Sequence, residues 1–173
     1  MNIIAIDTET TGLNPNEDEI IQFSAVDMQG HALADFLIKP IFHERWDEAE
    51  KINGISPEAV KDCLPLTDRK AEIERLLNSA DLIVGYSTQF DLDFLASGGI
   101  ELPDTETLDI KRIFESIKTE TAADGISRKW QSLVSCAAYY GYDWNGKPHD
   151  SLADARATMF CFQTMFGMLN RGK

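Results

Sequence analysis

Two carboxylates end the first apolar segment of the chain, in the sequence Ile6-Asp7-Thr8-Glu9. Side chains in a β-strand repeat every second residue, so Asp7 and Glu9 would project from one face with their Cβ atoms roughly 6–7 Å apart. Like charges beside apolar residues are costly because both lose water, and a divalent cation removes that cost. Oxygen ligands favour Mg²⁺ or Mn²⁺ over zinc. The pair therefore indicates a metal site, and the competing interpretation is a strand end with two solvated acids.

Two further acids stand where a carboxylate also has an ordinary structural use. Asp91 follows the apolar segment 82–85 and opens a predicted helix, where an acid favours the helix dipole, and Asp93 suits that role equally well. Asp154 makes a capping-box pattern with Ser151. At about 100° per residue, Asp154 also shares its helix face with a mostly apolar stripe: Thr158, Cys161, Met165 and Met168. An inward acid needs a partner from elsewhere in the fold, and a metal ion would serve.

A histidine precedes the last of these acids. His149 lies five residues before Asp154, in a loop after Gly146-Lys147-Pro148. Most loop histidines are simply solvated. Beside a metal site, however, an imidazole is a candidate general base, because it titrates near neutral pH. His31 and His43 lack such a setting, and we expect them to be structural or surface residues.

Charge is distributed unevenly along the chain. The net charge is −13, yet residues 1–110 hold 7 basic and 23 acidic residues, whereas residues 111–173 hold 9 and 6. This balance excludes a tight binder of long duplexes, since phosphates attract basic surfaces. An enzyme that grips a few terminal nucleotides through bound cations needs no basic face. We expect four cations of the second part to guide the strand: Lys111, Arg112, Arg128 and Lys129.

Length and composition predict a single globular domain over residues 1–173. The chain is 43% hydrophobic and 26% charged. Its three cysteines are widely spaced and form no Cys-x-x-Cys pair, which predicts reduced thiols and no zinc site. No apolar stretch approaches the roughly 18 residues that span a bilayer. The first residues lack a basic leader, so we expect a cytoplasmic protein without a membrane partner.

The order of predicted elements positions these residues in an α/β fold. Apolar or alternating runs predict strands at residues 2–7, 19–27, 31–39, 82–85 and 105–109. Amphipathic patterns and start signals predict helices from Ser56, and at 67–78, 89–97, 110–117, 129–140 and 151–170. Residues 116–127 are the best candidate for a mobile loop. Three strands followed by alternating helices and strands predict helix layers on a mixed sheet.

Three segments resemble the motifs of the DEDDh, or DnaQ-like, 3′–5′ exonucleases. The segments are Ile6-Asp7-Thr8-Glu9-Thr10-Thr11-Gly12-Leu13, Gly85-Tyr86-Ser87-Thr88-Gln89-Phe90-Asp91-Leu92-Asp93-Phe94-Leu95 and His149-Asp150-Ser151-Leu152-Ala153-Asp154-Ala155. They occur in the order of the family's motifs and extend the match over residues 3 to about 165. The resemblance implies an RNase H-like fold, with a mixed five-stranded sheet flanked by helices.

The resemblance also implies a mechanism and a set of site residues. Four acids would hold two Mg²⁺ or Mn²⁺ ions, and His149 would take the proton of the attacking water; the acids are Asp7, Glu9, Asp91 and Asp154. The products would be 5′-mononucleotides released from a 3′ end. Family positions that line the terminal-nucleotide pocket match Thr8, Thr10, Gly12 and Leu13. Leu13 and Phe90 would be apolar wedges against the last bases.

The chain departs from the family pattern in three places. The family often has His-Asn after the glycine of the second motif, where this chain has Tyr86-Ser87. A loop that often reads Ile-His-Gly-Ile is Ile52-Asn53-Gly54-Ile55 here. We therefore expect Ser87 and Asn53 to contact the terminal nucleotide in a different way. Gln22 stands where many relatives carry a glutamate close to the metal ligands, so metal affinity is expected to differ modestly.

The leading prediction is a free-standing, metal-dependent 3′–5′ exonuclease that acts on single-stranded ends. DNA is favoured over RNA, because Asp-Thr-Glu-Thr-Thr-Gly resembles the proofreading and DNA-repair members. One alternative is a proofreading subunit whose main partner is a DNA polymerase, although the sequence ends soon after the last predicted helix. Another is an RNA-processing exoribonuclease. A catalytically dead binding module would require the loss of a key residue, and all five are present.

Overall fold

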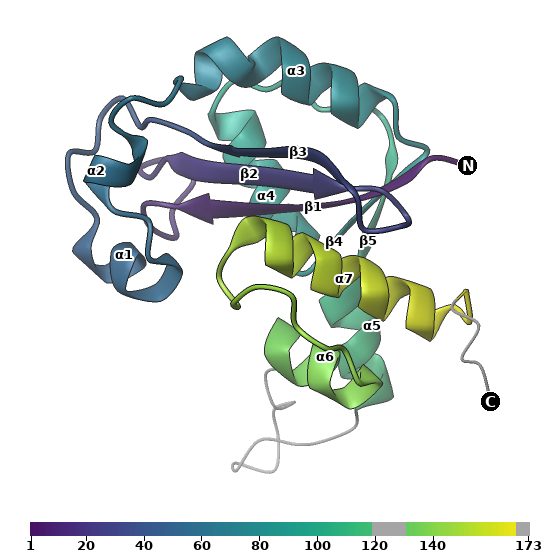
Figure 1. The fold of residues 1–173 in the computed structure, drawn as a ribbon. Helices are drawn as coiled ribbons and strands as arrows, with labels where there is room; N and C mark the ends of the chain where they lie inside the picture. The colour runs from purple at the N-terminus through teal and green to yellow at the C-terminus, as the bar shows by residue number, and fades with distance from the viewer. Residues whose placement is uncertain (119–130, 169–173) are drawn as a thin grey trace.

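A mixed five-stranded sheet forms the centre of the protein, which a computed structural model describes for residues 1–118 and 131–168 (Figure 1). The strand order is β3-β2-β1-β4-β5. The strands are β1 (Ile3–Thr10), β2 (Ile20–Val26), β3 (Ala32–Leu37), β4 (Leu82–Gly85) and β5 (Glu106–Asp109). β1, β2 and β3 are antiparallel neighbours, whereas β4 and β5 continue the sheet parallel to β1. The predicted α/β fold with a mixed sheet is confirmed.

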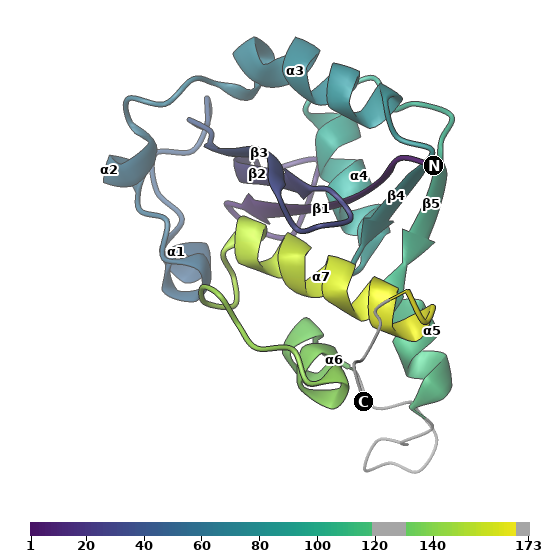
Figure 2. The ribbon, with the colours of Figure 1, turned by 45° about the vertical axis from the view of Figure 1, so that its right-hand side comes forward.

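Helices cover both faces of this sheet, as Figure 2 shows from a second direction. One face carries α3 (Leu66–Asn78) and α4 (Thr88–Ser97). The opposite face carries α5 (Ile110–Ile117), α6 (Leu133–Tyr140) and α7 (Ser151–Met165). Two short helices, α1 (Asp47–Asn53) and α2 (Pro57–Val60), lie beyond the carboxyl end of β1 (Figure 1).

The alternation of side chains along β1 divides the interior into two cores. Ile4 and Ile6 pack with buried residues of α3 and α4, whereas Ile3 and Ala5 pack with buried residues of α5, α6 and α7. Burial of an isoleucine side chain contributes roughly 1.5–3 kcal/mol, so both faces fix the register of the strand. Because the alternation continues, the two acids that end β1 face α7.

A third, smaller core forms beneath α1 and α2. Trp46, Ile55 and Val60 are buried with Ile21 of β2, and the Trp46 Nε1–H donates to the Ile55 carbonyl at 2.7 Å. The sequence did not predict α1, because its buried residue Asn53 is polar and no apolar period marks the segment. The helix matters for the site because it brings Asn53 toward the end of β1.

The last helices differ from their predicted ends. α7 stops at Met165 rather than at residue 170, because Gly167 adopts a left-handed conformation with φ 66°. α6 starts at Leu133, after Ser132 caps it by accepting from the Ser135 N–H. Residues 119–127 of the predicted mobile loop, and the predicted helix start at 129–130, lie outside the described residues.

Cys63, Cys136 and Cys161 are free thiols. Within the two described ranges, each helix is too short or too polar to cross a bilayer.

Candidate active site

The topology brings the three motifs to one edge of the sheet. β1 and β4 are parallel, so their carboxyl ends meet at the same edge, where ligands of open α/β sheets commonly bind. α4 starts immediately after β4, and α7 starts beneath the end of β1 (Figure 1). This edge gathers the acids of all three motifs: Asp7 and Glu9 from β1, Asp91 from α4 and Asp154 from α7.

Burial, together with nearby like charges, raises the pKa of all four acids. Burial, followed by the charges of Asp91, Asp154 and Glu9, holds the pKa of Asp7 well above its ordinary value. Burial and the charge of Asp154 raise the pKa of Glu9 to about 8, although a hydrogen bond from Asn53 opposes the shift. Burial raises the pKa of Asp91 and of Asp154 to about 7. Such a group is costly to ionise unless a cation shares the site.

Burial separates two acids of α4, Asp91 and Asp93, that suit a helix start equally well by local pattern. Asp91 is 3% exposed, and its Oδ1 accepts from the Thr8 N–H at 2.9 Å and from the Thr8 hydroxyl at 2.7 Å. Asp93 is exposed and accepts from Gln89 Nε2 at 2.8 Å. The structure therefore places Asp91, and not Asp93, among the clustered carboxylates. The Thr8 hydroxyl proton is used in the hydrogen bond to Asp91.

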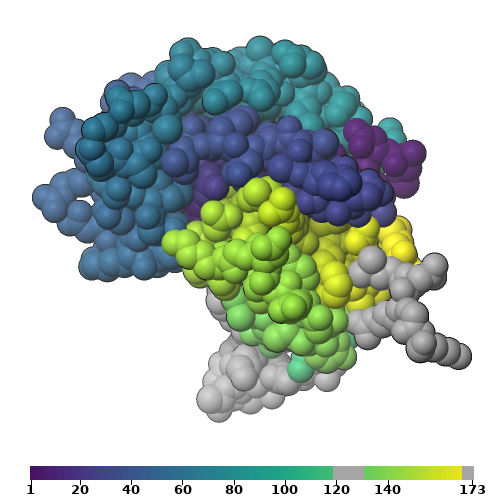
Figure 3. Space-filling model, viewed as in Figure 1, coloured from purple at the N-terminus to yellow at the C-terminus, as the bar shows by residue number. Residues whose placement is uncertain are grey.

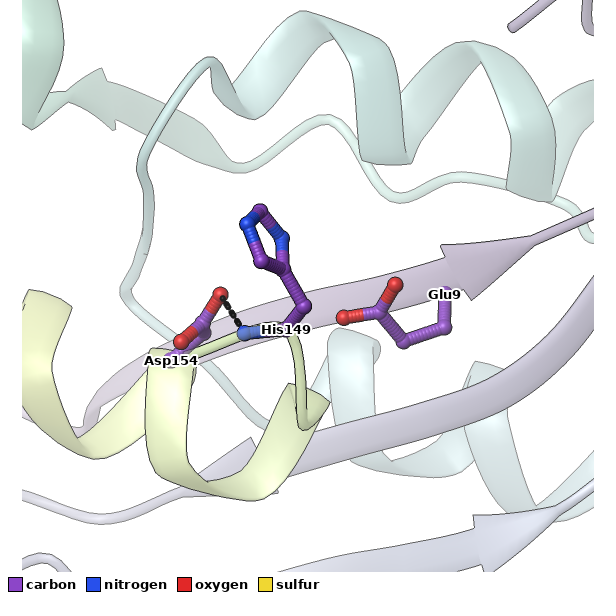
Figure 4. Close-up of side chains that lie close together, drawn as sticks. All are labelled: Glu9, His149 and Asp154. Carbon is purple, nitrogen blue, oxygen red and sulfur yellow. Dashed lines mark hydrogen bonds between the residues drawn. The ribbon is translucent and has the colours of Figure 1, made fainter. Parts of the chain in front are cut away.

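His149 lies between Glu9 and Asp154 (Figure 4). Possible ligand atoms of these three residues lie within 4.8 Å of one another. The backbone N–H of His149 donates to Asp154 Oδ2 at 3.2 Å. Asp154 Oδ1 is buried and has no hydrogen-bond partner within the described part of the chain. A buried carboxylate oxygen without a donor is costly, and a divalent cation of the Mg²⁺ class would satisfy it.

Backbone strain coincides with the site. Among residues 1–118 and 131–168, only Ser87 and His149 are non-glycine residues with positive φ, at 71° and 64°. This conformation costs roughly 1–2 kcal/mol for an L-residue, and such strain concentrates at functional sites. The Ser87 N–H donates to Asp109 Oδ1 at 3.1 Å, which helps to hold the turn between β4 and α4.

The predicted nucleotide contacts of the first motif and the α1 loop mostly direct their polar atoms inward. The Thr10 hydroxyl donates to the Gly12 carbonyl at 2.5 Å. Asn53 is 4% exposed, donates weakly to the Thr10 carbonyl at 3.5 Å, and accepts from the Ile55 N–H at 2.9 Å. A Cβ at Gly12 would lie 2.3 Å from a carboxylate oxygen of Asp18, so a larger residue would have to displace that side chain. These residues shape the turn after β1.

The two predicted wedges differ in exposure. Leu13 is 83% exposed at the turn after β1. Phe90 is half-buried, and its ring lies 4.8 Å from that of Phe94, between centroids. Of the predicted guiding cations, Arg112 lies 3.6 Å from Asp109, between Nε and Oδ2, whereas Arg128 and Lys129 fall outside the described residues.

A histidine clamp beside the site was missed by the sequence analysis. Glu19 accepts from the backbone N–H groups of residues 41–43 at 2.6–2.9 Å and from His43 Nδ1 at 2.9 Å. His43 Nε2 also lies 3.5 Å from Asp18 Oδ1, and Asp18 Oδ2 accepts from the Asn14 N–H. His43 is thus a structural residue, as expected, but it ties two loops together beside Leu13. Almost every residue has a backbone N–H group, so no sequence motif could predict these hydrogen bonds.

Comparison with known proteins supports the assignment of the motifs. The family model for the RNase T exonucleases matches residues 4–162. "RNA exonuclease 4" of Gibberella zeae is 31% identical over 165 residues, which are 92% of this chain and 48% of that protein. "DNA polymerase III subunit epsilon" of Treponema pallidum is 26% identical and aligns with 93% of this chain and 74% of its own length. The chain spans about half the length of the RNA exonuclease 4 proteins it matches, at 48% and 56%.

Solved structures agree on the fold. A structure titled "Exonuclease I (apo)" superimposes with a TM-score of 0.76 at 18% identity, covering 96% of this chain and 42% of that one. "Exonuclease X in complex with 5' overhanging duplex DNA" gives 0.71 at 17% identity, covering 98% and 94%. With the family model extending over most of the chain, these likenesses confirm the resemblance drawn from the motifs: the protein belongs to the RNase T exonuclease family, the DnaQ-like branch of the RNase H-like superfamily.

Proposed function

We propose that this protein is a metal-dependent 3′–5′ exonuclease that releases 5′-mononucleotides from single-stranded ends, with DNA preferred over RNA. One observation carries the proposal. Four acids from β1, α4 and α7 share a site beside a loop histidine, and a buried oxygen of Asp154 has no donor among the described residues. Protein donors leave part of this carboxylate charge uncompensated, which is the property that a cation site requires.

The donor set fits two hard divalent cations. Asp7, Glu9, Asp91 and Asp154 offer only carboxylate oxygens, the ligands that Mg²⁺ and Mn²⁺ prefer. In two-metal nucleases, such ions activate a water and stabilise the leaving oxygen of an in-line displacement. The protein itself holds the acids in place: Thr8 fixes Asp91, and the His149 N–H fixes one oxygen of Asp154.

His149 would act as the general base. Its imidazole stands beside the acids on a loop whose backbone is held by Asp154, so it can accept the proton of an attacking water. The exposed side chain of Leu13 would stack against the last base, which is a sequence-tolerant contact. We expect His149→Ala to lower kcat by about 10²–10⁴ while metal binding persists.

Relatives support DNA and RNA to different degrees. The Treponema relative is named as a DNA polymerase subunit, and a structural neighbour was solved with DNA. Two curated relatives, at 31% and 28% identity, carry the name RNA exonuclease 4. An exoribonuclease is therefore the second candidate. The epsilon relative also keeps a polymerase partner among the candidates. We also propose that residues 1–173 act as one domain and that the protein acts in the cytoplasm.

Digestion of matched oligonucleotides tests the proposal. DNA and RNA strands of one sequence, labelled at the 5′ end, are incubated with the protein in Mg²⁺ or in EDTA, and the products are resolved by length and by mass. We expect stepwise shortening from the 3′ end in Mg²⁺, faster for DNA, and none in EDTA. Asp91→Asn should abolish digestion, whereas the matched control Asp93→Asn, two residues away and exposed, should keep it. No digestion of either strand, or equal activity in both variants, would overturn the proposal.

A further inference from the structure

A buried polar network joins the start of α7 to the first antiparallel strands. Ser151, the first residue of α7, is fully buried and is held twice by β2. Its backbone N–H donates to Gln22 Oε1 at 3.3 Å, and its hydroxyl lies 2.6 Å from the hydroxyl of Ser24. In Figure 3 the yellow-green start of α7 lies directly against the violet-blue surface of β2 and β3.

One carboxylate on β3 orients both of these bonds. Asp35 Oδ1 accepts from the Ser24 hydroxyl at 3.0 Å and from Gln22 Nε2 at 3.2 Å. Ser24 has a single hydroxyl proton, and it points to Asp35, so the proton between the two serines comes from Ser151. The Gln22 amide is likewise turned so that its oxygen faces the Ser151 N–H. Without Asp35, Ser24 and Gln22 would each lose one of the two hydrogen bonds that orient them and would keep the bond to Ser151.

The network runs alongside the metal-site carboxylates. Asp35 pairs with Ser24 across β3 and β2, and Ser24 pairs with Asp7 across β2 and β1. Gln22 is the cross-strand neighbour of Glu9. The row therefore spans the face of the sheet that carries α7, from an exposed position on β3 to the acids of β1. It fixes α7 in register with the strand that supplies half of the ligands.

His149 depends on this register because its own side chain is exposed. It lies two residues before Ser151, with φ 64°, and its N–H bonds to Asp154 one turn into α7. A strained residue keeps its conformation only when its surroundings over-determine it. Ser151 supplies the fixed point on one side of His149. We infer that Asp35 is a positioning residue, which acts through Ser24, Gln22 and Ser151 to hold His149 in its catalytic orientation.

A double-mutant cycle tests this inference, which rests on the proposed function. Loss of an outer hydrogen-bond partner typically costs about 10–100-fold in activity, so Asp35→Ala should lower kcat about tenfold with KM nearly unchanged. Asp35→Asn keeps an accepting oxygen and should recover most of that loss. In a His149→Ala background, Asp35→Ala should have no further effect, because the group it positions is gone. The matched control is Asp27→Ala on the same hairpin. Among residues 1–118 and 131–168 its carboxylate bonds only the turn at Gln29 and His31, so the variant should keep wild-type kcat.

A second readout does not depend on activity. Backbone amides of residues 149–154 should exchange with solvent faster in Asp35→Ala than in Asp27→Ala, at equal global stability. Unchanged kcat or unchanged exchange in Asp35→Ala would overturn the inference, as would an equal loss of kcat with and without His149. Failure of the proposed function would show differently, as a wild-type protein that digests nothing.

Discussion

Two clusters of carboxylates flank the end of β1, and the pKa values of Glu9 in one and Glu19 in the other are shifted in opposite directions. The first cluster is Asp7, Glu9, Asp91 and Asp154, and the second is Asp18 and Glu19. At the sheet edge, burial and like charges raise the pKa of Glu9 to about 8 and of Asp154 to about 7. Beside the turn after β1, burial would also raise the pKa of Glu19, but hydrogen bonds from the Ile41 N–H, the His43 ring and neighbouring N–H groups outweigh it and lower that pKa.

The difference lies in the supply of donors. Glu19 receives four hydrogen bonds, three of them from successive backbone N–H groups, so its charge is satisfied by the protein. From the residues that the structure describes, Asp154 receives one on Oδ2 and none on its buried Oδ1. Both clusters are acidic, and a count of charges would not distinguish them. The cluster that the protein leaves unsatisfied is the one suited to cations, and the satisfied one fixes a loop.

The largest expected effect comes from neutralising an acid of the unsatisfied cluster. Asp154→Asn keeps the shape of the side chain but removes a proposed metal ligand, so we expect no detectable digestion of an oligonucleotide. The same change removes a repelling charge that raises the pKa of Asp7, so the metal-free protein should unfold at a higher temperature at pH 8. Activity assays and thermal unfolding in EDTA measure the two effects. If Asp154→Asn lost stability as well as activity, the Asp154 charge would not be unfavourable in the metal-free protein, and the contrast with Glu19 would fail.

The second prediction concerns pH, where the clusters have opposite signs. The folded-state pKa of Glu9 lies near 8, above its ordinary 4.5, so the folded metal-free protein binds a proton more tightly than the unfolded chain does. Its stability should therefore fall as pH rises from about 5 to 8. Glu19, with a lowered pKa, contributes stability that is lost only as pH falls below 4.5.

Mg²⁺ should cancel the first of these effects and not the second. The ion binds the ionised acids, so it should raise the unfolding temperature more at pH 8 than at pH 5.5. Thermal unfolding over this pH range, with Mg²⁺ or EDTA, measures both. An equal stabilisation by Mg²⁺ at the two pH values would contradict the assignment of the raised pKa values to the cation site.

The sequence predicted the unsatisfied cluster better than its surroundings. Spacing along β1 placed Asp7 and Glu9 on one face of the strand, and the pattern of α7 turned Asp154 toward the protein. In the structure Ile3 and Ala5 of the same strand face pack with α7, and Asp154 is 8% exposed. The local pattern did not separate Asp91 from Asp93, because both lie near a helix start, and only the family resemblance chose Asp91. Burial beneath Thr8 decides it, and burial depends on how α4 docks against β1. The direction of a side chain was thus predictable where the two-residue repeat of a strand or the helical repeat determined it.

What the sequence could not predict are contacts made by backbone groups or between distant segments. The Glu19 clamp depends on N–H groups of residues 41–43, which every residue except proline possesses. The positive φ of His149 arises from the junction of a loop with α7. The Ser24–Ser151 bond joins residues 127 positions apart. None of these has a local pattern, so tertiary structure alone reveals them.

The third prediction disturbs the satisfied cluster. Glu19→Gln keeps the shape of the side chain but weakens charge-assisted bonds to residues 41–43, so it should lower the free energy of unfolding by about 1–2 kcal/mol. Because the clamp holds a loop and no ligand, kcat should stay within about threefold of wild type. Denaturant unfolding and the oligonucleotide assay measure the two quantities. A variant that lost hydrolysis at unchanged stability would assign Glu19 to the catalytic cluster instead.

The smallest expected effect is a change in KM on mutation of Leu13, an exposed residue in the turn after β1. Leu13 and Phe42 are equally exposed, at 83%, but Leu13 follows β1, which carries Asp7 and Glu9, whereas Phe42 lies on the loop that Glu19 binds. If Leu13 stacks on the terminal base, Leu13→Ala should raise KM about three- to tenfold, in keeping with roughly 1 kcal/mol of stacking. Phe42→Ala should leave KM unchanged, and neither variant should alter stability by more than about 0.5 kcal/mol. Steady-state kinetics on one oligonucleotide measure the pair. Equal effects of the two variants would show that the strand crosses both loops, and the clamp would then belong to the binding surface rather than to the scaffold.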